Sequence, residues 1–264
     1  MNKLLFSFLF LSFSCDTGNL TVLADLPSSL KEVSAAQITS KSDILWVIED
    51  AGNRNHLYGL NKEGKIIKDL TVTNCENNDW EDLTSDKKGN LYIGDFGNNS
   101  KKRKKFTIIK IKNPEKAIKD LRADKIHFTL PKDEKSEDFE AFFLLNNFFY
   151  IFSKNDEKGK LYKVSNTVGN NEAIFLTHFN LEGQQNKVTS ADCYKNKIIL
   201  LNHEKVWVLS DFKNDDFFKG NIKSIDFNHN SQKEGVYFKD SNTILITDET
   251  KKGSGGNIYT FKLN

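Results

Sequence analysis

Short apolar runs rich in β-branched and aromatic residues recur along the chain, each followed by a polar turn. This pattern is typical of β-strands, and helical periodicity is nearly absent. The runs fall into five units with a period of about 50 residues. The predicted first strands cover 35–39, 81–84, 140–145, 191–194 and 234–238, and the second strands 44–48, 91–93, 148–152, 197–201 and 243–247. The predicted third strands cover 56–60, 106–111, 160–164, 205–209 and 257–262, and the fourth strands 65–72, 125–130, 173–179 and 221–227.

Four strands in each of five units predict an all-β fold, a five-bladed β-propeller whose four-stranded blades surround a central channel. The last unit lacks its fourth strand, and residues 19–26 have a strand pattern but no unit of their own. We expect this N-terminal strand to complete the C-terminal blade and to close the ring. A β-sandwich of similar strand count is the alternative, and the matched repeats favour the propeller. One short helix is expected at 114–123, and residues 19–264 are expected to form one domain.

The first residues have the pattern of an export signal. A positive start at Met1–Lys3 precedes an apolar stretch, 4–13, which is too short to span a bilayer. The small residue Ser14 and then Cys15 follow, which predicts a lipoprotein-type signal peptide over 1–14 and lipidation of Cys15. Plain secretion and a buried N-terminal strand are the alternatives. On this interpretation the protein is a monomer of the cell envelope, held at the outer membrane by its lipid alone.

Composition narrows the function classes. The chain has 264 residues, of which 38% are hydrophobic and 28% charged, so an intrinsically disordered chain is excluded. Because 38 Lys and Arg balance 36 Asp and Glu to a net charge of +2, the sequence argues against nucleic-acid binding. Three cysteines are too few for a disulfide-built scaffold, and we expect Cys75 and Cys193 to be unpaired.

Acidic residues recur where first strands begin and second strands end, and in a propeller these positions meet at one mouth of the channel. Asp95 lies 14 residues after Glu81, and Asp248 lies 14 residues after Glu234. Equal spacing predicts equivalent positions in different blades. Converging carboxylates repel one another unless something neutralises them, and Ca²⁺ accepts six to eight oxygen ligands. The predicted Ca²⁺ ligands are Glu81, Glu140, Asp192, Glu234, Asp95 and Asp50.

Other interpretations of these acidic residues are possible. The acids can instead pair with Lys154, Arg103 or backbone N–H groups. Zinc is disfavoured because the five histidines are scattered and no Cys/His cluster occurs. Trp80 is either a stacking platform or an ordinary packing residue between blades. The predicted ligand-binding residues at this mouth are Trp80, Asn98, Arg103, Lys154 and Gln232.

Five motifs that contain these residues occur in a fixed order. They are Asn78-Asp79-Trp80-Glu81-Asp82-Leu83, Tyr92-Ile93-Gly94-Asp95-Phe96-Gly97-Asn98-Asn99 with Arg103, Asp138-Phe139-Glu140-Ala141, Val188-Thr189-Ser190-Ala191-Asp192 and Ser231-Gln232-Lys233-Glu234-Gly235. In these motifs the chain resembles a family of exported β-propeller proteins of Bacteroidota, mostly uncharacterised. The resemblance implies an exported propeller and a shared site at the quoted positions, without an established reaction. A looser similarity, in architecture and single acidic positions, is to five-bladed calcium-activated nucleotidases.

Three functions are compatible with this sequence. The first is a binding protein whose Ca²⁺-occupied mouth holds a small molecule, a glycan or an envelope protein. The second is a Ca²⁺-dependent hydrolase of a phosphoric or carboxylic ester, anhydride or lactone, with Glu81 or Glu140 as the general base. The third is a scaffold in which ions only stabilise the ring.

Overall fold

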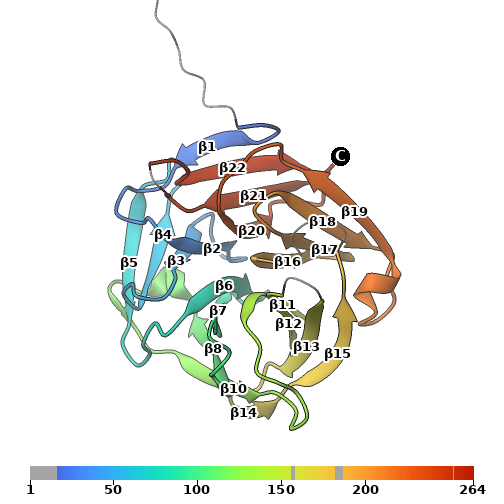
Figure 1. Ribbon diagram of the computed structural model, residues 1–264. Helices are drawn as coiled ribbons and strands as arrows, with labels where there is room; N and C mark the ends of the chain where they lie inside the picture. Colours follow the sequence, from blue (N-terminus) through green and yellow to red (C-terminus); the bar gives the residue numbers. More distant parts are fainter. Residues whose placement is uncertain (1–16, 156–157, 182–186, 252) are drawn as a thin grey trace, which may run out of the picture.

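The computed structural model describes residues 17–155, 158–181, 187–251 and 253–264, and the predicted signal peptide and Cys15 lie outside them. Five antiparallel sheets surround a central axis, as Figure 1 shows. The predicted five-bladed β-propeller is therefore confirmed. No helix of the described part is long and apolar enough to cross a membrane. Cys75 and Cys193 are both free thiols, as predicted.

Each blade runs from an inner strand at the axis to an outer strand at the rim. Blade 1 comprises β2 (Val33–Ile38), β3 (Leu45–Glu49), β4 (His56–Leu60) and β5 (Ile66–Val72). Blade 2 comprises β6 (Trp80–Ser85), β7 (Asn90–Asp95), β8 (Lys105–Lys112) and β10 (Asp124–Thr129). Blade 3 comprises β11 (Phe139–Leu145), β12 (Phe148–Ser153), β13 (Gly159–Ser165) and β15 (Ile174–Phe179). Blade 4 comprises β16 (Ser190–Tyr194), β17 (Lys197–Leu201), β18 (Lys205–Ser210) and β19 (Asn221–Asp226).

Blade 5 contains both ends of the folded chain. Its inner strands are β20 (Lys233–Phe238), β21 (Thr243–Asp248) and β22 (Asn257–Lys262). Its outer strand is β1 (Thr21–Asp25), which pairs antiparallel with β22. Two short strands extend neighbouring sheets in parallel: β9 (Asp120–Leu121) joins β5, and β14 (Gly169–Glu172) joins β10. Two 3₁₀ turns, η1 (Pro114–Lys116) and η2 (Phe217–Lys219), complete the described elements.

The helix expected at 114–123 does not form. The segment makes only the 3₁₀ turn η1, after which Ala117 is already extended. The outer edge of β5 then captures the chain: the Thr71 amide donates to the Lys119 carbonyl at 2.9 Å. Pairing at an open strand edge satisfies backbone groups that a short, isolated helix would hold only weakly in water.

Five apolar clusters hold the ring together, one in each contact between neighbouring blades. Because a blade is covered on both faces, its middle strands are buried along their whole length, as in β3 and β7. Outer strands have one free face and alternate instead, as in β5. This burial explains why the middle strands read as continuous apolar runs in the sequence.

The inner strands share an irregularity at their first residues. In blades 1, 2, 3 and 5 the register shifts by one residue, so that Ser34, Glu81, Glu140 and Glu234 are left without a partner on the second strand. A bulge of this kind redirects a side chain and is common beside functional sites. The repeated bulge therefore places one polar residue of each of these blades at the same mouth of the channel.

Candidate functional site

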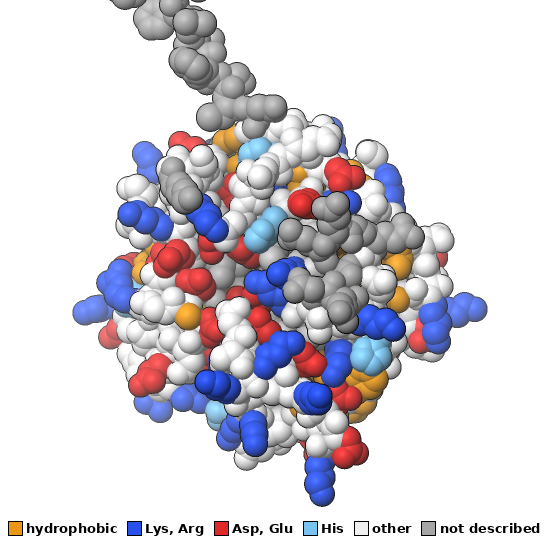
Figure 2. Space-filling view, viewed as in Figure 1, with side chains coloured by type: hydrophobic (Ala, Val, Ile, Leu, Met, Phe, Trp, Pro, Cys, Tyr) orange, Lys and Arg blue, Asp and Glu red, His pale blue; other side chains and the backbone are white. Residues whose placement is uncertain are grey.

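Three of the four bulge residues are glutamates, and together they define the acidic mouth: Glu81, Glu140 and Glu234. The bulge serine of blade 1 instead donates to the backbone of the next blade, from Ser34 Oγ to the Trp80 carbonyl at 2.9 Å. In blade 4, Thr189 makes the matching bond to the Lys233 carbonyl at 2.7 Å. Figure 2 shows acidic side chains gathered near the centre of this face. At these equivalent positions, a hydroxyl side chain forms a hydrogen bond between neighbouring blades, whereas a glutamate adds an acidic group to the mouth.

Glu81 is coupled to a second carboxyl group. Its side chain is hydrogen-bonded to Asp79, two residues earlier in the chain. Burial, followed by repulsion from Glu140 and Asp79, raises the pKa of Glu81 well above its ordinary value. Two carboxyl groups in hydrogen-bond contact share one proton, and here the proton belongs to Glu81 while Asp79 accepts. Glu81 therefore has the character of a general acid.

Gly97 makes room for this carboxyl pair. A Cβ atom at position 97 would stand 2.1 Å from Glu81 Oε1 and 2.4 Å from Asp79 Oδ2. Such distances are far inside van der Waals contact, so any side chain there would displace the pair. The glycine of the Gly-Asn turn after β7 is thus a requirement of the site.

Glu140 has a different partner in the same ring. It is buried, and its carboxylate forms an ion pair with the ammonium group of Lys154, which follows β12 in the same blade. Burial raises the pKa of Glu140 to about 8, because Lys154 offsets only part of that cost and Glu234 adds repulsion. Burial opposes the charge of Lys154, but the surrounding carboxylates, Glu140 first, leave its pKa raised. A carboxylate that gains its charge near pH 8, beside a fixed ammonium group, is suited to act as a general base.

The remaining acids extend the negative field toward blades 5 and 1. Glu234 Oε1 lies at hydrogen-bond distance, 2.9 Å, from His203 Nε2, so this histidine reaches the mouth. Burial and repulsion by Glu32 raise the pKa of Asp50 to about 6. Burial and repulsion by Glu234 raise the pKa of Glu249 to about 8. The direction of these pKa shifts indicates that nearby positive charge does not offset burial and repulsion among the acids in this part of the mouth.

The floor of the mouth is closed by a buried aspartate. Asp82 Oδ2 accepts from the backbone N–H of Phe142 at 3.0 Å and of Ala191 at 3.2 Å. Its Oδ1 accepts from Ser190 Oγ at 2.8 Å, and Ser190 Oγ accepts in turn from the Val236 amide at 3.1 Å. These bonds join blades 2, 3, 4 and 5 across the axis. Asp82 therefore seals the channel beneath the acidic mouth.

Three residues predicted to bind metal or ligand form a structural loop clamp instead. Arg103 donates to Asp95 Oδ1 at 3.1 Å, to the Asp95 carbonyl at 3.0 Å and to the Gly97 carbonyl at 2.9 Å. Asp95 Oδ2 accepts from the Asn78 amide group at 3.0 Å. The Asn98 side chain donates to Ser136 Oγ at 2.9 Å and to the Glu137 carbonyl at 2.8 Å, and its Oδ1 accepts from the backbone N–H group of Arg103 at 3.0 Å. Because their polar atoms already have partners, these residues shape the loop that carries Gly97.

Trp80 and Asp192 lie elsewhere than expected. The Trp80 side chain is fully buried between blades 1 and 2, so its ring cannot stack on a ligand. Asp192 is the third residue of β16, deeper than the mouth, where it accepts from the Phe238 amide at 2.8 Å. It faces the hollow at the opposite end of the channel. Gln232, beside Glu234, keeps a buried Oε1 atom that has no partner in the described residues.

Within the described part of the chain, the acids near the mouth do not converge on a common point where a metal ion could bind. Among the described residues, no group of three or more His, Cys, Asp or Glu side chains is arranged to hold a metal ion. Glu140 is ion-paired with Lys154 and Asp95 with Arg103, while Asp192 lies at the other end of the channel. The predicted six-carboxylate Ca²⁺ set is therefore not brought together in this structure.

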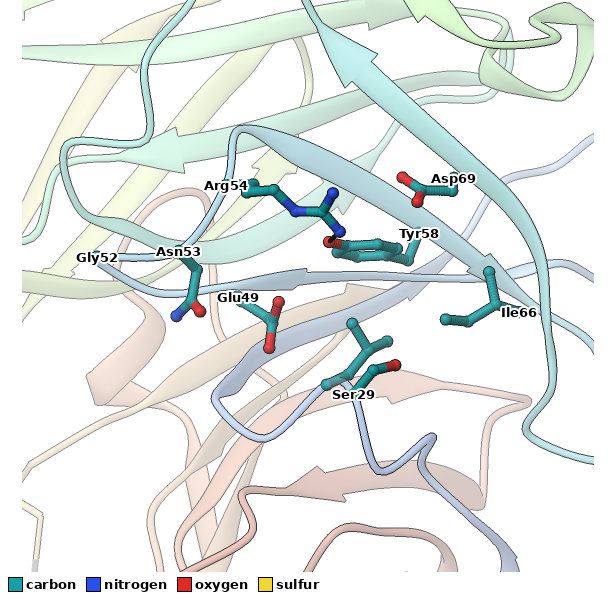
Figure 3. A pocket seen from close by; sticks show the side chains of 9 residues that line it. Ser29, Glu49, Gly52, Asn53, Arg54, Tyr58, Ile66 and Asp69 are labelled. Atoms are coloured by element: carbon teal, nitrogen blue, oxygen red, sulfur yellow. Dashed lines mark hydrogen bonds between the residues drawn. The ribbon is translucent and has the colours of Figure 1, made fainter.

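A smaller pocket of about 300 Å³ opens beside the mouth on blade 1. Figure 3 shows Arg54 and Tyr58 pointing toward each other there, with a guanidinium-to-hydroxyl distance of 3.2 Å. Asn53 also lines this pocket and donates to Asp50 Oδ1 at 3.1 Å. Through Asn53 the pocket thus adjoins Asp50.

Several participants had no role assigned from the sequence, although Asp79 and Asp82 belong to the motifs quoted above. Asp79 stands next to the recognised Trp80-Glu81 pair, and Glu249 follows Asp248 at a strand end, so both had a signal in their position. Asp82 had no such signal. An aspartate in an inner strand indicates a polar position, but not that its side chain bonds to other blades. His203 is one of the five scattered histidines, and its contact with Glu234 depends on the neighbouring blade.

Comparison with known proteins supports the fold. No family model matches the chain, and no curated protein sequence matches it. Among solved structures, the PQQ-bound aldose sugar dehydrogenase of Streptomyces coelicolor has a TM-score of 0.55 at 8% identity, covering 93% of this chain and 98% of that one. The gluconolactonase XC5397 of Xanthomonas campestris has a TM-score of 0.54 at 9% identity, covering 94% and 92%. At such low identity the likeness extends to the propeller fold alone.

Proposed function

We propose that the acidic mouth hydrolyses a lactone or a carboxylic ester, with Glu81 as general acid and Glu140 as general base. One observation carries this proposal: the two glutamates occupy the same bulge in adjacent blades, yet hold their protons differently. Glu81 is protonated against Asp79, whereas Glu140 is paired with Lys154. One carboxyl group bonded to another acid and one paired with an ammonium group can divide the roles of proton donor and proton acceptor in acid–base catalysis.

The chemistry follows from these roles. The Glu140 carboxylate takes a proton from a water molecule while the oxygen of that water bonds to the carbonyl carbon of the substrate. The Lys154 ammonium group stabilises the negative oxygen that develops there. The bond from carbon to the ring or ester oxygen then breaks, and Glu81 gives its proton to the departing alkoxide. The proton on Glu140 returns to the Glu81–Asp79 pair through solvent, which restores the starting state.

The comparisons support a lactone as the first substrate to test. The gluconolactonase XC5397 has the same overall fold, so a propeller of this kind can host lactone hydrolysis. The test measures hydrolysis of sugar lactones and p-nitrophenyl esters by the wild type, Glu81→Gln and Glu140→Gln. Glu76→Gln, at an exposed position near the site, is the control. We expect each site variant to lose at least about a hundredfold in kcat while the control keeps it. Full activity in Glu140→Gln would rule out this mechanism.

A binding mouth that contains Ca²⁺ is the second candidate. It is favoured by the raised pKa values of Asp50 and Glu249, which a cation near these acids would lower. No catalytic step is assigned to the ion, since the described residues do not form a metal site. Thermal unfolding in EDTA and after Ca²⁺ addition tests this candidate. A ligand at 100 times its Kd stabilises by about 2.7 kcal/mol, so a rise abolished in Glu249→Gln would support it. An unchanged midpoint would exclude it.

Export and lipid attachment remain part of this proposal. They rest on the apolar stretch before Cys15 and on the resemblance to exported propellers. Fractionation of cells that produce the full chain, or Cys15→Ser, tests them. The wild type is expected in the membrane fraction and the variant in the soluble fraction. Equal distribution of the two would contradict a lipid anchor.

A further inference from the structure

The channel has a second hollow, at the end opposite the acidic mouth. It has a volume of about 1590 Å³ and is lined by the turns between the first two strands of all five blades. The hydrogen bonds of Asp82 across the axis separate it from the mouth. Pockets for single small ligands usually measure about 300–1,000 Å³. The hollow therefore has room for several linked units.

The rim of this hollow is positively charged. Three aspartates and six lysines line it, a formal net charge of +3; the lysines are Lys62, Lys87, Lys88, Lys110, Lys195 and Lys239. Lys88, Lys195 and Lys239 are exposed and come from three different blades, and none of them forms an ion pair with a described residue. Asp192, on the floor, already accepts from the Phe238 amide at 2.8 Å. The hollow thus attracts anions, in contrast to the mouth.

The other lining groups narrow the kind of anion. No arginine is present, so the rigid fork that binds phosphate or carboxylate in two places is missing. Asparagine side chains, which donate and accept, recur around the rim and match the hydroxyl groups of sugars; examples are Asn61, Asn146 and Asn196. Tyr194 is half-buried beside Phe238, with ring centroids 5.8 Å apart, and the Lys195 ammonium group lies 5.2 Å from the centroid of its ring, so an aromatic and a cationic group stand together here.

We propose that this hollow binds an acidic oligosaccharide, a chain of sugar units that carry carboxylate groups. The lysines attract its charges from three blades, the asparagines bond its hydroxyl groups, and Tyr194 packs on a sugar ring. The acidic mouth at the other end repels the same ligand, so binding is confined to this end. The proposal is independent of the hydrolytic function, because it uses none of the residues of the mouth.

Calorimetric titration of the full chain with hexagalacturonate, a neutral galactose hexamer and hexaglutamate tests this proposal. The variants are the triple substitution Lys88→Gln, Lys195→Gln and Lys239→Gln, and a control double substitution, Lys132→Gln and Lys135→Gln, at exposed positions outside the hollow. We expect the uronate to bind the wild type and the control equally, and the triple variant about tenfold more weakly. The single variant Tyr194→Ala should also bind the uronate more weakly than the wild type, and the salt dependence of uronate binding should stay unchanged.

Three results would overturn the proposal. The first is no binding of the uronate to the wild type, and the second is equal binding to the triple variant. The third is hexaglutamate binding as tightly as the uronate, which would identify the hollow as a surface for acidic protein segments. Circular dichroism of each variant checks that its fold is retained.

Discussion

Ser190 Oγ donates a hydrogen bond to Asp82 Oδ1 at 2.8 Å, and this bond joins blade 4 to blade 2 across the axis of the propeller. The two residues stand at equivalent positions of their inner strands, one residue after the mouth ring. Asp82 is fully buried, and burial raises its pKa well above the ordinary value in spite of the bonds it accepts. Near the axis, the hydrogen bonds of Asp82 therefore add to the apolar contacts that hold neighbouring blades together.

Removal of this acceptor should destabilise the whole ring. In Asp82→Ala, the amides of Phe142 and Ala191 and the hydroxyl of Ser190 would lose their partner in a place without water. We expect a loss of about 3–5 kcal/mol in the free energy of unfolding, measured in urea. Asp82→Asn, which keeps one acceptor oxygen, should lose less. Asp133→Ala, at an exposed position, is the control and should change little.

The acids of the mouth make stability depend on pH. A carboxyl group whose folded pKa lies above its unfolded value stabilises the fold below the unfolded pKa and loses this contribution as pH rises through the folded pKa. For Glu249 and Glu140 that window runs from 4.5, the ordinary pKa of a glutamate, to about 8. The free energy of unfolding should therefore fall between these pH values. Glu249→Gln should flatten the fall and gain about 1–2 kcal/mol at pH 9, whereas an equal slope in the variant would refute this account.

The same titration should govern hydrolysis. Because Glu140 acts as a base only when charged, kcat/KM should rise with pH up to about 8 and then level off. Lys154→Met removes the ammonium group that favours the charged form, so the rise should move to higher pH and the rate should fall. A profile that is unchanged in Lys154→Met would remove both residues from the mechanism.

Arg103 is expected to act on stability and on the site through the loop clamp. Arg103→Gln removes three hydrogen bonds to Asp95 and Gly97, with an expected loss of about 2–3 kcal/mol in the free energy of unfolding. Lys102→Gln, at the neighbouring exposed position, is the matched control. Since Gly97 borders the Glu81–Asp79 pair, kcat should fall while KM changes little. A selective rise in KM would instead indicate that Arg103 contacts the ligand.

Gly97→Ala tests the carboxyl pair directly. The added methyl group would stand 2.1 Å from Glu81 Oε1, so the pair must separate. The kcat should drop to the level of Glu81→Gln, as measured with the same lactone. Activity close to wild type would show that the pair is not needed. Gly52→Ala is a poor control, because its φ of +88° is itself unfavourable for alanine; Ser100→Ala serves instead.

Much of the fold could be read from the sequence. Middle strands such as β7 and β12 are covered on both faces and so appear as uninterrupted apolar runs, which made all five blades visible. The helix predicted at 114–123 was wrong because this segment pairs with the edge of β5, which lies far away in the sequence and leaves no mark in the local pattern. The repeated 14-residue spacing located Glu81 and Glu234 at the same end of the channel, where the structure also has them.

The five-bladed architecture and the end at which Glu81, Glu140 and Glu234 emerge were determined by the sequence alone, because strand periodicity and repeat spacing are local properties. Tertiary structure decided what these acids contact. One residue of shift along a strand turns a side chain to the opposite face. Hence the bulges decide that Trp80 packs between blades while Glu81 enters the mouth. Partners such as Lys154 for Glu140 and Ser190 for Asp82 depend on how loops and blades meet in space, and no spacing along the chain encodes that distance.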